Sequence, residues 1–310
     1  MTGPPSAAEV DIWSVRLGGP PPDGAWAALS DAERDRARRM RSPAGRRDFV
    51  RSHYATREIL ARYTAMAPAA LEFRLGARGK PRAAGPVEFS LSHTDGLALI
   101  AVSAADVGVD VELIRAAPLA DGLIARCLTA AERAAVAGAD DPTTAFLRYW
   151  TAKESYLKGL GIGLAEPLEN LEVRWDGQAG RIARSGEQDR RWRLRALAVG
   201  PHHLAAVSVL APGPGTALPV RYREWPGELP RPSFRTDSAC SGCGNGLPGR
   251  VGRFRSGSRF SSVFLETAMV KMRACLYPGP SREVPAGSVA GGRQVVEYPA
   301  PCVGRDSPGP

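Results

Sequence analysis

Strand-like and helix-like patterns of hydrophobic residues follow one another along the first 225 residues. Residues 10–17 alternate between apolar and polar side chains, as a half-buried strand does. Residues 30–33, Ser-Asp-Ala-Glu, form a capping box that opens a helix, and a second helix is expected from about 43 to 63. Apolar runs at 87–91 and 97–102 predict two further strands.

The same alternation continues along the chain. The polar stretch 92–96 predicts a turn between the last two strands, and residues 107–113 predict a strand whose three valines share one face. Residues 129–132 form a second capping box. An Asp-Pro pair predicts the start of a helix over 143–158, and Gly159 is expected to end it.

The following segment predicts an antiparallel meander, because an Asp-Gly pair, a strong hairpin signal, separates two of its strands. The expected strands cover 171–175, 181–183, 192–199 and 204–210. Helices between antiparallel strands, without a glycine-rich βαβ fingerprint, favour an α+β fold. The pattern divides into two successive mixed halves near residue 105.

Composition narrows the class of protein. With 310 residues and 44% hydrophobic content, the chain can build one sizeable domain or two modest ones. Its longest apolar runs are far too short to cross a bilayer, and no basic segment followed by an apolar one begins the chain. Only Cys127 lies in the first 225 residues. We therefore expect a cytoplasmic protein in a reducing compartment.

Residues 226–310 differ from the rest in composition. Gly and Pro make up 24 of these 85 residues, a density typical of low-complexity segments, so we expect a disordered extension. Its Cys240-Ser-Gly-Cys243 resembles half of a zinc site, but no second close pair or histidine follows. The net charge of +9 over the chain suggests either a polyanionic partner or a merely arginine-rich composition.

The strand at 107–113 carries two carboxylates. Asp110 and Glu112 project from the face opposite its valines, because strand side chains alternate. Adjacent carboxylates repel each other unless a cation neutralises them, and Mg²⁺ binds through one or two carboxylates together with substrate phosphates. The alternative is an exposed edge strand with a polar face, and the spacing alone does not decide between the two.

The later helix carries a second group of polar residues. Trp150, Glu154 and Lys158 follow one another at intervals of four along one stripe, with Lys153 beside them. One interpretation is a surface Glu–Lys pair, worth about 0.3–0.5 kcal/mol, next to a tryptophan in the core. The other makes Glu154 a third carboxylate near the strand pair, with Lys158 reaching the same phosphates.

Together the two motifs resemble the 4′-phosphopantetheinyl transferase superfamily. The resemblance rests on Gly-x-Asp-x-Glu at 108–112 and, some 40 residues later, on Trp-x-x-Lys-Glu-x-x-x-Lys at 150–158. Three further segments resemble the Sfp-type branch: an Arg-rich helix at 34–47, Gly-Lys-Pro at 79–81 and Phe-Ser-Leu-Ser-His-Thr at 89–94. The resemblance spans roughly residues 10–210.

The resemblance implies a pseudo-twofold monomer whose halves, 1–105 and 106–225, hold coenzyme A in the cleft between them. It implies Mg²⁺-dependent transfer of the 4′-phosphopantetheine group to a serine of an apo acyl or peptidyl carrier protein. Glu154 is the candidate for activating that serine, with Lys158 offsetting charge. By motif position it implies Asp110, Glu112 and Glu154 as metal ligands, Lys80, Ser92 and His93 as nucleotide contacts, and Lys153 and Lys158 near the pyrophosphate.

Several assignments stay open at this point. Arg34, Arg36 and Arg38 align only loosely with the basic nucleotide contacts of the family. Glu132 lies either near the active site or only in its own capping box. The loop at 161–171 is the expected docking surface for the carrier.

Two functions of other classes compete with group transfer. Acidic pairs beside lysines on a basic protein also suit a metal-dependent nuclease, but these lysines lie on a helix and no aromatic-basic face suggests a nucleic-acid groove. The other alternative is a non-catalytic binder of coenzyme A or of a carrier protein. The three carboxylates Asp110, Glu112 and Glu154 argue against it, because binding alone does not require them. We therefore expect an enzyme without nucleic-acid or membrane partners. His53, His202 and His203 are expected to be structural.

Overall fold

The computed structural model describes residues 5–6, 9–76, 79–115, 121–163, 167–184, 187–189, 191–211 and 217–227. All of them belong to one unit of the chain. Of the extension expected from residue 226, only Pro226 and Gly227 are among the described residues. The Cys240–Cys243 pair lies outside them.

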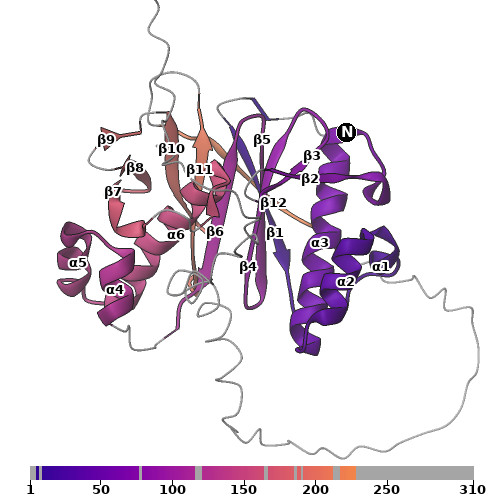
Figure 1. Cartoon of the computed structure of the whole chain (residues 1–310), viewed down its shortest axis with the longest axis horizontal. Helices are drawn as coiled ribbons and strands as arrows, with labels where there is room; N and C mark the ends of the chain where they lie inside the picture. The colour runs from indigo at the N-terminus through magenta and orange to yellow at the C-terminus, as the bar shows by residue number, and fades with distance from the viewer. Residues whose placement is uncertain are drawn as a thin grey trace, which may run out of the picture. The chain divides into compact units, whose positions relative to one another are not determined.

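The first sheet has the strand order β12-β1-β5-β4 (Figure 1). β1, β5 and β4 pair antiparallel, whereas β12 adds to β1 in parallel. The turn between β4 and β5 consists only of Asp95 and Gly96, so the expected five-residue turn is wrong and Ser92 and His93 belong to the strand. The four strands are β1 (Val10–Arg16), β4 (Glu88–Thr94), β5 (Leu97–Ser103) and β12 (Val220–Glu224).

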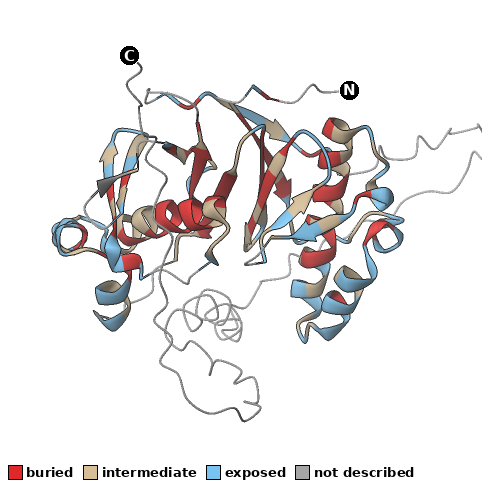
Figure 2. Ribbon diagram, turned by 45° about the horizontal axis from the view of Figure 1, so that its top comes forward, coloured by how far each residue is buried: buried red, intermediate tan, exposed pale blue. Residues whose placement is uncertain are grey.

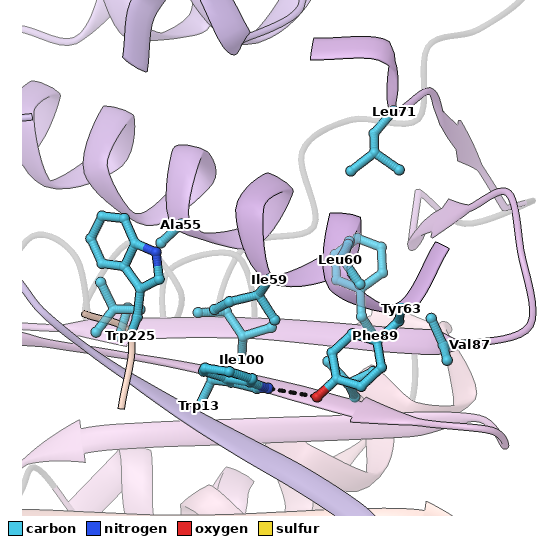
Figure 3. Packing of buried hydrophobic residues seen from close by; sticks show 13 residues of the cluster. Trp13, Ala55, Ile59, Leu60, Tyr63, Leu71, Val87, Phe89, Ile100 and Trp225 are labelled. Atoms are coloured by element: carbon cyan, nitrogen blue, oxygen red, sulfur yellow. Dashed lines mark hydrogen bonds between the residues drawn. The ribbon is translucent and has the colours of Figure 1, made fainter. Parts of the chain in front are cut away.

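Helix α3 (Pro43–Thr64) covers one face of this sheet and confirms the helix expected over 43–63. It begins at Ser42, whose side chain caps the first turn. Its apolar stripe packs against β1, where Trp13 Nε1 donates to the hydroxyl of Tyr63 at 2.8 Å (Figure 3). The first half of the chain therefore has its core between one helix and one sheet.

Smaller elements complete this half. Helices α1 (Ala25–Ala28) and α2 (Asp31–Arg39) pack on α3 through an apolar cluster, and the expected capping box opens α2. A 3₁₀ turn, η1 (Pro68–Ala70), leads to a hairpin of β2 (Phe73–Leu75) and β3 (Pro81–Ala83).

The second sheet has the order β6-β11-β10-β8-β7, with β9 beside β8, and every pairing is antiparallel. This confirms the predicted meander and the α+β class. Its strands are β6 (Val107–Leu113), β7 (Leu171–Asp176), β8 (Ala179–Arg184), β9 (Glu187–Gln188), β10 (Trp192–Leu197) and β11 (His203–Leu210).

Helix α6 (Pro142–Leu160) packs on this sheet and is largely buried (Figure 2). It begins at the expected N-cap Asp141 but ends at Gly161, in a left-handed conformation, instead of at Gly159. A Cβ on Gly159 would lie 2.5 Å from the Trp192 ring, so this glycine serves close packing inside the helix. Helices α4 (Asp121–Cys127) and α5 (Ala130–Ala137) and the 3₁₀ turn η3 (Leu168–Asn170) lie before and after it in the chain.

The two sheets meet through an apolar interface and a polar seam. The valines of β6 pack in one buried cluster with residues of β1, β5 and β11. At the edge of β6 facing β4, the hydroxyls of Ser90 and Ser92 accept the backbone N–H groups of Val109 and Val111 at 3.2 and 3.4 Å. In this seam, serine side chains, rather than the backbone of a neighbouring strand, accept hydrogen bonds from the backbone N–H groups at the edge of β6.

Strand β12 was not expected from the sequence. The chain leaves the second sheet after β11 and returns to the first, where Arg221 and Arg223 donate to the buried carboxylate of Asp11 at 2.6 and 3.1 Å. The C-terminal part of the expected second half, 106–225, thus completes the sheet of the first half. Among the described residues no helix has the length and apolar character that a membrane crossing requires.

Candidate active site

Helix α6 meets strand β6 along the stripe that the sequence predicted. At one end Trp150 Nε1 donates to Glu112 Oε1 at 3.2 Å, and at the other Lys158 Nζ donates to Asp110 Oδ1 at 2.6 Å. Glu154 occupies the middle of the same stripe, one helical turn from each. The structure therefore turns Glu154 toward the strand that carries the other two carboxylates.

All three carboxylates are buried. Asp110 has 0% of its surface exposed, Glu112 8% and Glu154 6%. The alternatives of an exposed polar strand face and of a surface Glu–Lys pair are therefore wrong. Buried carboxylates require compensating charge and hydrogen bonds, because removing them from water costs several kcal/mol each.

Gly108 explains how α6 comes this close to β6. A Cβ at this position would lie 2.0 Å from the carbonyl oxygen of Ser155 and 2.3 Å from the backbone nitrogen of Gly159. Only glycine allows the helix backbone to rest directly on the strand. The glycine of the Gly-x-Asp-x-Glu motif thus brings its carboxylates within reach of the helix.

Ser92 connects the two halves at this point. Its hydroxyl donates to Asp110 Oδ1 at 2.8 Å and accepts from Lys158 Nζ at 2.9 Å. Sequence reasoning assigned Ser92 to the nucleotide and missed this bridging role, as well as that of Ser90. The signal available was the Ser-x-Ser spacing, which places both hydroxyls on one face of a strand.

His93 follows Ser92 on β4 and so projects from the opposite face. That face is the one covered by α3, where Phe89 and Leu91 of the same strand pack. β4 is an edge strand of its sheet.

The Lys153 ammonium has a set of internal contacts of its own. It is 1% exposed, and its ammonium donates to Glu132 Oε2 at 2.5 Å and to the carbonyls of Cys127 and Leu168 at 2.7 and 3.0 Å. Burial lowers the pKa of Lys153, and the neighbouring Glu132 opposes that shift. Lys153 therefore ties α6 to α4, α5 and η3. Its expected place near the pyrophosphate stays a prediction.

Glu132 forms the expected capping box and also pairs with Lys153. Lys80 likewise has its ammonium in internal contacts, to Asp106 Oδ1 at 3.3 Å and to the carbonyl of Gly159 at 2.9 Å. It links the β2–β3 hairpin to the end of α6. The structure pairs Arg34 with Asp31 and Arg38 with Asp35 on α2 itself.

The region that carries these carboxylates matches a known family. The sequence profile of the 4′-phosphopantetheinyl transferase superfamily matches residues 106–207. The 4′-phosphopantetheinyl transferase HetI of Nostoc sp. is 34% identical over 175 residues, covering 53% of this chain and 73% of that protein. The chain belongs to the 4′-phosphopantetheinyl transferase superfamily.

Two further phosphopantetheinyl transferases extend the match. The phosphopantetheinyl transferase of Thraustochytrium sp. is 27% identical over 231 residues, covering 66% of this chain and 80% of that protein. The 4′-phosphopantetheinyl transferase of Bacillus subtilis is 25% identical over 194 residues, covering 58% and 86%. Asp110, Glu112, Glu154 and Lys158 all fall within the profile match.

The carboxylates of this phosphopantetheinyl transferase fit a hard divalent cation in their chemistry, since all their donor atoms are oxygens. Within the described ranges no three Asp, Glu, His or Cys side chains are already spaced as a ligand set. In the structure the Lys158 ammonium pairs with one oxygen of this group, Asp110 Oδ1.

A cavity of about 440 Å³ opens elsewhere in the transferase, between β1, β5, β12 and the turn after β10. Ser14, Leu97, Val199 and Arg223 are among its lining residues. Neither the three carboxylates nor Ser92, His93 or Lys158 lines it. This cavity is therefore separate from the carboxylate site.

Proposed function

We propose that this chain transfers the 4′-phosphopantetheine group of coenzyme A to a serine of an apo acyl or peptidyl carrier protein, releasing adenosine 3′,5′-bisphosphate. The observation that supports the assignment of its site is the burial of Asp110, Glu112 and Glu154 against one helix stripe. A nuclease or a non-catalytic binder is less consistent with the named relatives, which are transferases.

Asp110, Glu112 and Glu154 are proposed to hold Mg²⁺. Their oxygen donors suit this ion, and their burial supplies negative charge that a cation would offset. When bound, Mg²⁺ supplies positive charge beside the pyrophosphate of the substrate.

Coenzyme A is proposed to pass around the edge of β4. On one face of β4, Ser92 lies beside Lys158, and these two residues would contact the pyrophosphate. On the other face, His93 would contact the 3′-phosphate. Lys80 would contact the nucleotide only through its backbone or after its ammonium leaves Asp106.

The reaction forms a bond between the serine oxygen and the β-phosphorus and breaks the bond from that phosphorus to the bridging oxygen. Glu154 accepts the serine proton, directly or through a water molecule; the water route is favoured because a carboxylate that holds a cation is a weaker base. The Lys158 ammonium offsets charge on the pyrophosphate as adenosine 3′,5′-bisphosphate leaves.

The architecture is proposed to be a pseudo-twofold monomer with coenzyme A between halves 1–105 and 106–225, followed by an extension over 226–310. In support, each sheet has its own long helix, α3 on the first and α6 on the second. A cytoplasmic location fits the use of coenzyme A as substrate.

Asp110→Ala and Glu154→Gln should each lower transfer by roughly 10²-fold or more, because each removes one carboxylate charge from the proposed reacting centre. Mass spectrometry of a carrier incubated with coenzyme A and Mg²⁺ measures transfer, and circular dichroism checks the fold. Glu172→Gln, which alters an exposed ion pair on β7, is the matched control and should retain activity. Near-wild-type turnover of a folded Glu154→Gln protein would contradict the assignment.

A further inference from the structure

Lys158 is held by the protein itself. Its ammonium donates to Asp110 Oδ1 at 2.6 Å, to Ser92 Oγ at 2.9 Å and to the carbonyl oxygen of Val109 at 3.3 Å. An ammonium has three hydrogens to donate, so these contacts use all of them. In this arrangement Lys158 cannot bind a substrate phosphate without giving up one of its internal partners.

The position of this ammonium also matters for a cation. Asp110 is fully buried, whereas the Lys158 side chain is 24% exposed, so Lys158 lies on the more accessible side of the pair. A divalent ion bound to Asp110 Oδ1 would lie a few ångströms from the ammonium. Two positive charges at that distance repel each other strongly in a poorly solvated site.

We propose that Lys158 is the resident counter-cation of Asp110 in the metal-free protein and that a divalent cation displaces it. The proposal rests on the metal site described under Proposed function. Displacement does two things at once: it frees Asp110 Oδ1 for the metal and it frees the ammonium for the substrate phosphates. The lysine therefore stabilises the buried carboxylate before loading and becomes available for phosphate only after loading.

Ser92 sets the resting position. Its hydroxyl donates to the same Asp110 oxygen that Lys158 contacts and accepts from Lys158, so it holds the two charges together. It is itself fixed by the backbone N–H of Val111 at 3.4 Å. Ser92 can keep its bond to Asp110 when the ammonium leaves.

The first test measures Mg²⁺ and Mn²⁺ binding by titration calorimetry on the full chain without coenzyme A. Lys158→Met removes the competing ammonium, so the cation should bind roughly tenfold or more tightly, the size expected for loss of one charge-assisted contact. Arg174→Met is the matched control, since it removes one positive charge from an exposed pair with Glu172. It should leave the affinity within about twofold of the wild-type value.

The outcomes separate this proposal from the proposed function. Equal affinities in the wild type and Lys158→Met would overturn the exchange and leave the metal site standing. Weaker binding in Lys158→Met would also overturn it, because the lysine would then support the metal. Failure of both proteins to bind either ion would overturn the exchange, because the cation alone would then not displace the ammonium, and would leave the metal site of the loaded enzyme standing.

A second measurement needs no variant. Wild-type protein is treated with a limiting amine-acylating reagent with and without Mg²⁺, and modified lysines are quantified by mass spectrometry of the digest. Lys80 and Lys153, paired with Asp106 and Glu132, serve as internal references. Acylation of Lys158 should increase severalfold with Mg²⁺ relative to these references. A rate for Lys158 that Mg²⁺ leaves unchanged would show that the ammonium stays on Asp110, and would overturn the proposal.

Discussion

At the residue scale, two lysines on the same helix show how position around the axis decides a role. Lys153 and Lys158 are five positions apart, which places them about 140° apart around α6. Lys153 therefore points to the α4–α5 side, where it is 1% exposed and paired with Glu132. Lys158 points to β6 and β4, where it pairs with Asp110 and keeps access to solvent.

His93→Ala should weaken binding of coenzyme A far more than binding of 3′-dephospho-coenzyme A. A charge-assisted contact to the 3′-phosphate is worth about 1.5–3 kcal/mol, which corresponds to a loss of tenfold or more. KM values for the two substrates measure the difference. Equal losses for both substrates would place His93 away from that phosphate.

His53 should make stability depend on pH between about 4 and 6.5. It stacks on Phe49, and burial lowers its pKa from 6.5 to about 4. The folded state thus binds this proton less readily than the unfolded chain, so the contribution is complete above pH 6.5 and is lost as pH falls toward 4. The free energy of unfolding should decrease by up to about 3 kcal/mol across this window.

Urea unfolding at a series of pH values measures this effect. Carboxylates also titrate near the lower end of the window, so the informative quantity is the difference between wild type and His53→Gln. That variant has no imidazole to protonate, and its curve should be flatter by the stated amount. Parallel curves for the two proteins would exclude His53 as the source.

At the scale of elements, the contact between β6 and α6 builds the site. Gly108→Ala should lower the free energy of unfolding by about 1–3 kcal/mol. The Cβ of the new alanine would collide with backbone atoms of α6, which cannot rotate away as a side chain can. The shift of α6 should also reduce transfer, since Trp150 and Lys158 would lose their register on Glu112 and Asp110. Thermal unfolding and the carrier assay measure the two effects.

Gly122→Ala in α4 is the matched control. No atom lies within 4 Å of a Cβ built there, and a helical alanine is favoured over glycine by up to about 1 kcal/mol. This variant should be as stable as wild type or more stable. A Gly108→Ala protein of unchanged stability would mean that the helix and strand are less tightly apposed than the structure indicates.

At the scale of the whole molecule, β12 and Trp225 complete the first sheet and its core. Trp225 is 5% exposed, belongs to the core beneath α3 and donates to Glu58 Oε2 at 2.8 Å. A chain ending after Pro230 should therefore fold and transfer phosphopantetheine at close to the full-length rate. A chain ending after Ala211 should lose at least about 3 kcal/mol, because the buried Asp11 would lose both arginines.

Melting temperatures of the two truncated chains provide the comparison. The shorter chain should melt roughly 6–12 °C lower or fail to fold, following the usual scaling of stability with melting temperature. The longer chain should match the full-length protein. A large loss of stability or activity after truncation at Pro230 would show that residues beyond it are integral to the enzyme.

Local sequence signals determined most of the elements and their boundaries. Capping residues such as Ser30 and Asp141, together with alternating valines on β6, depend only on neighbours within a few positions, so they could be identified without a fold. Local signals alone also led to the wrong prediction that α6 ends at Gly159. A glycine near a helix end usually marks its stop, but here the nearby Trp192 ring requires it inside the helix.

The sequence also determined the faces on which Asp110, Glu112 and Glu154 lie, because their spacings fix those faces on a strand and a helix. Only the tertiary structure decided the partners of the lysines and the return of β12 to β1, since these depend on segments up to about two hundred residues apart. Contacts of that range leave no periodic pattern in the chain. The pairing of buried charges is decided only when the sheets and helices pack. Burial then removes each ion from water, and a buried ion is stable only beside a group of opposite charge.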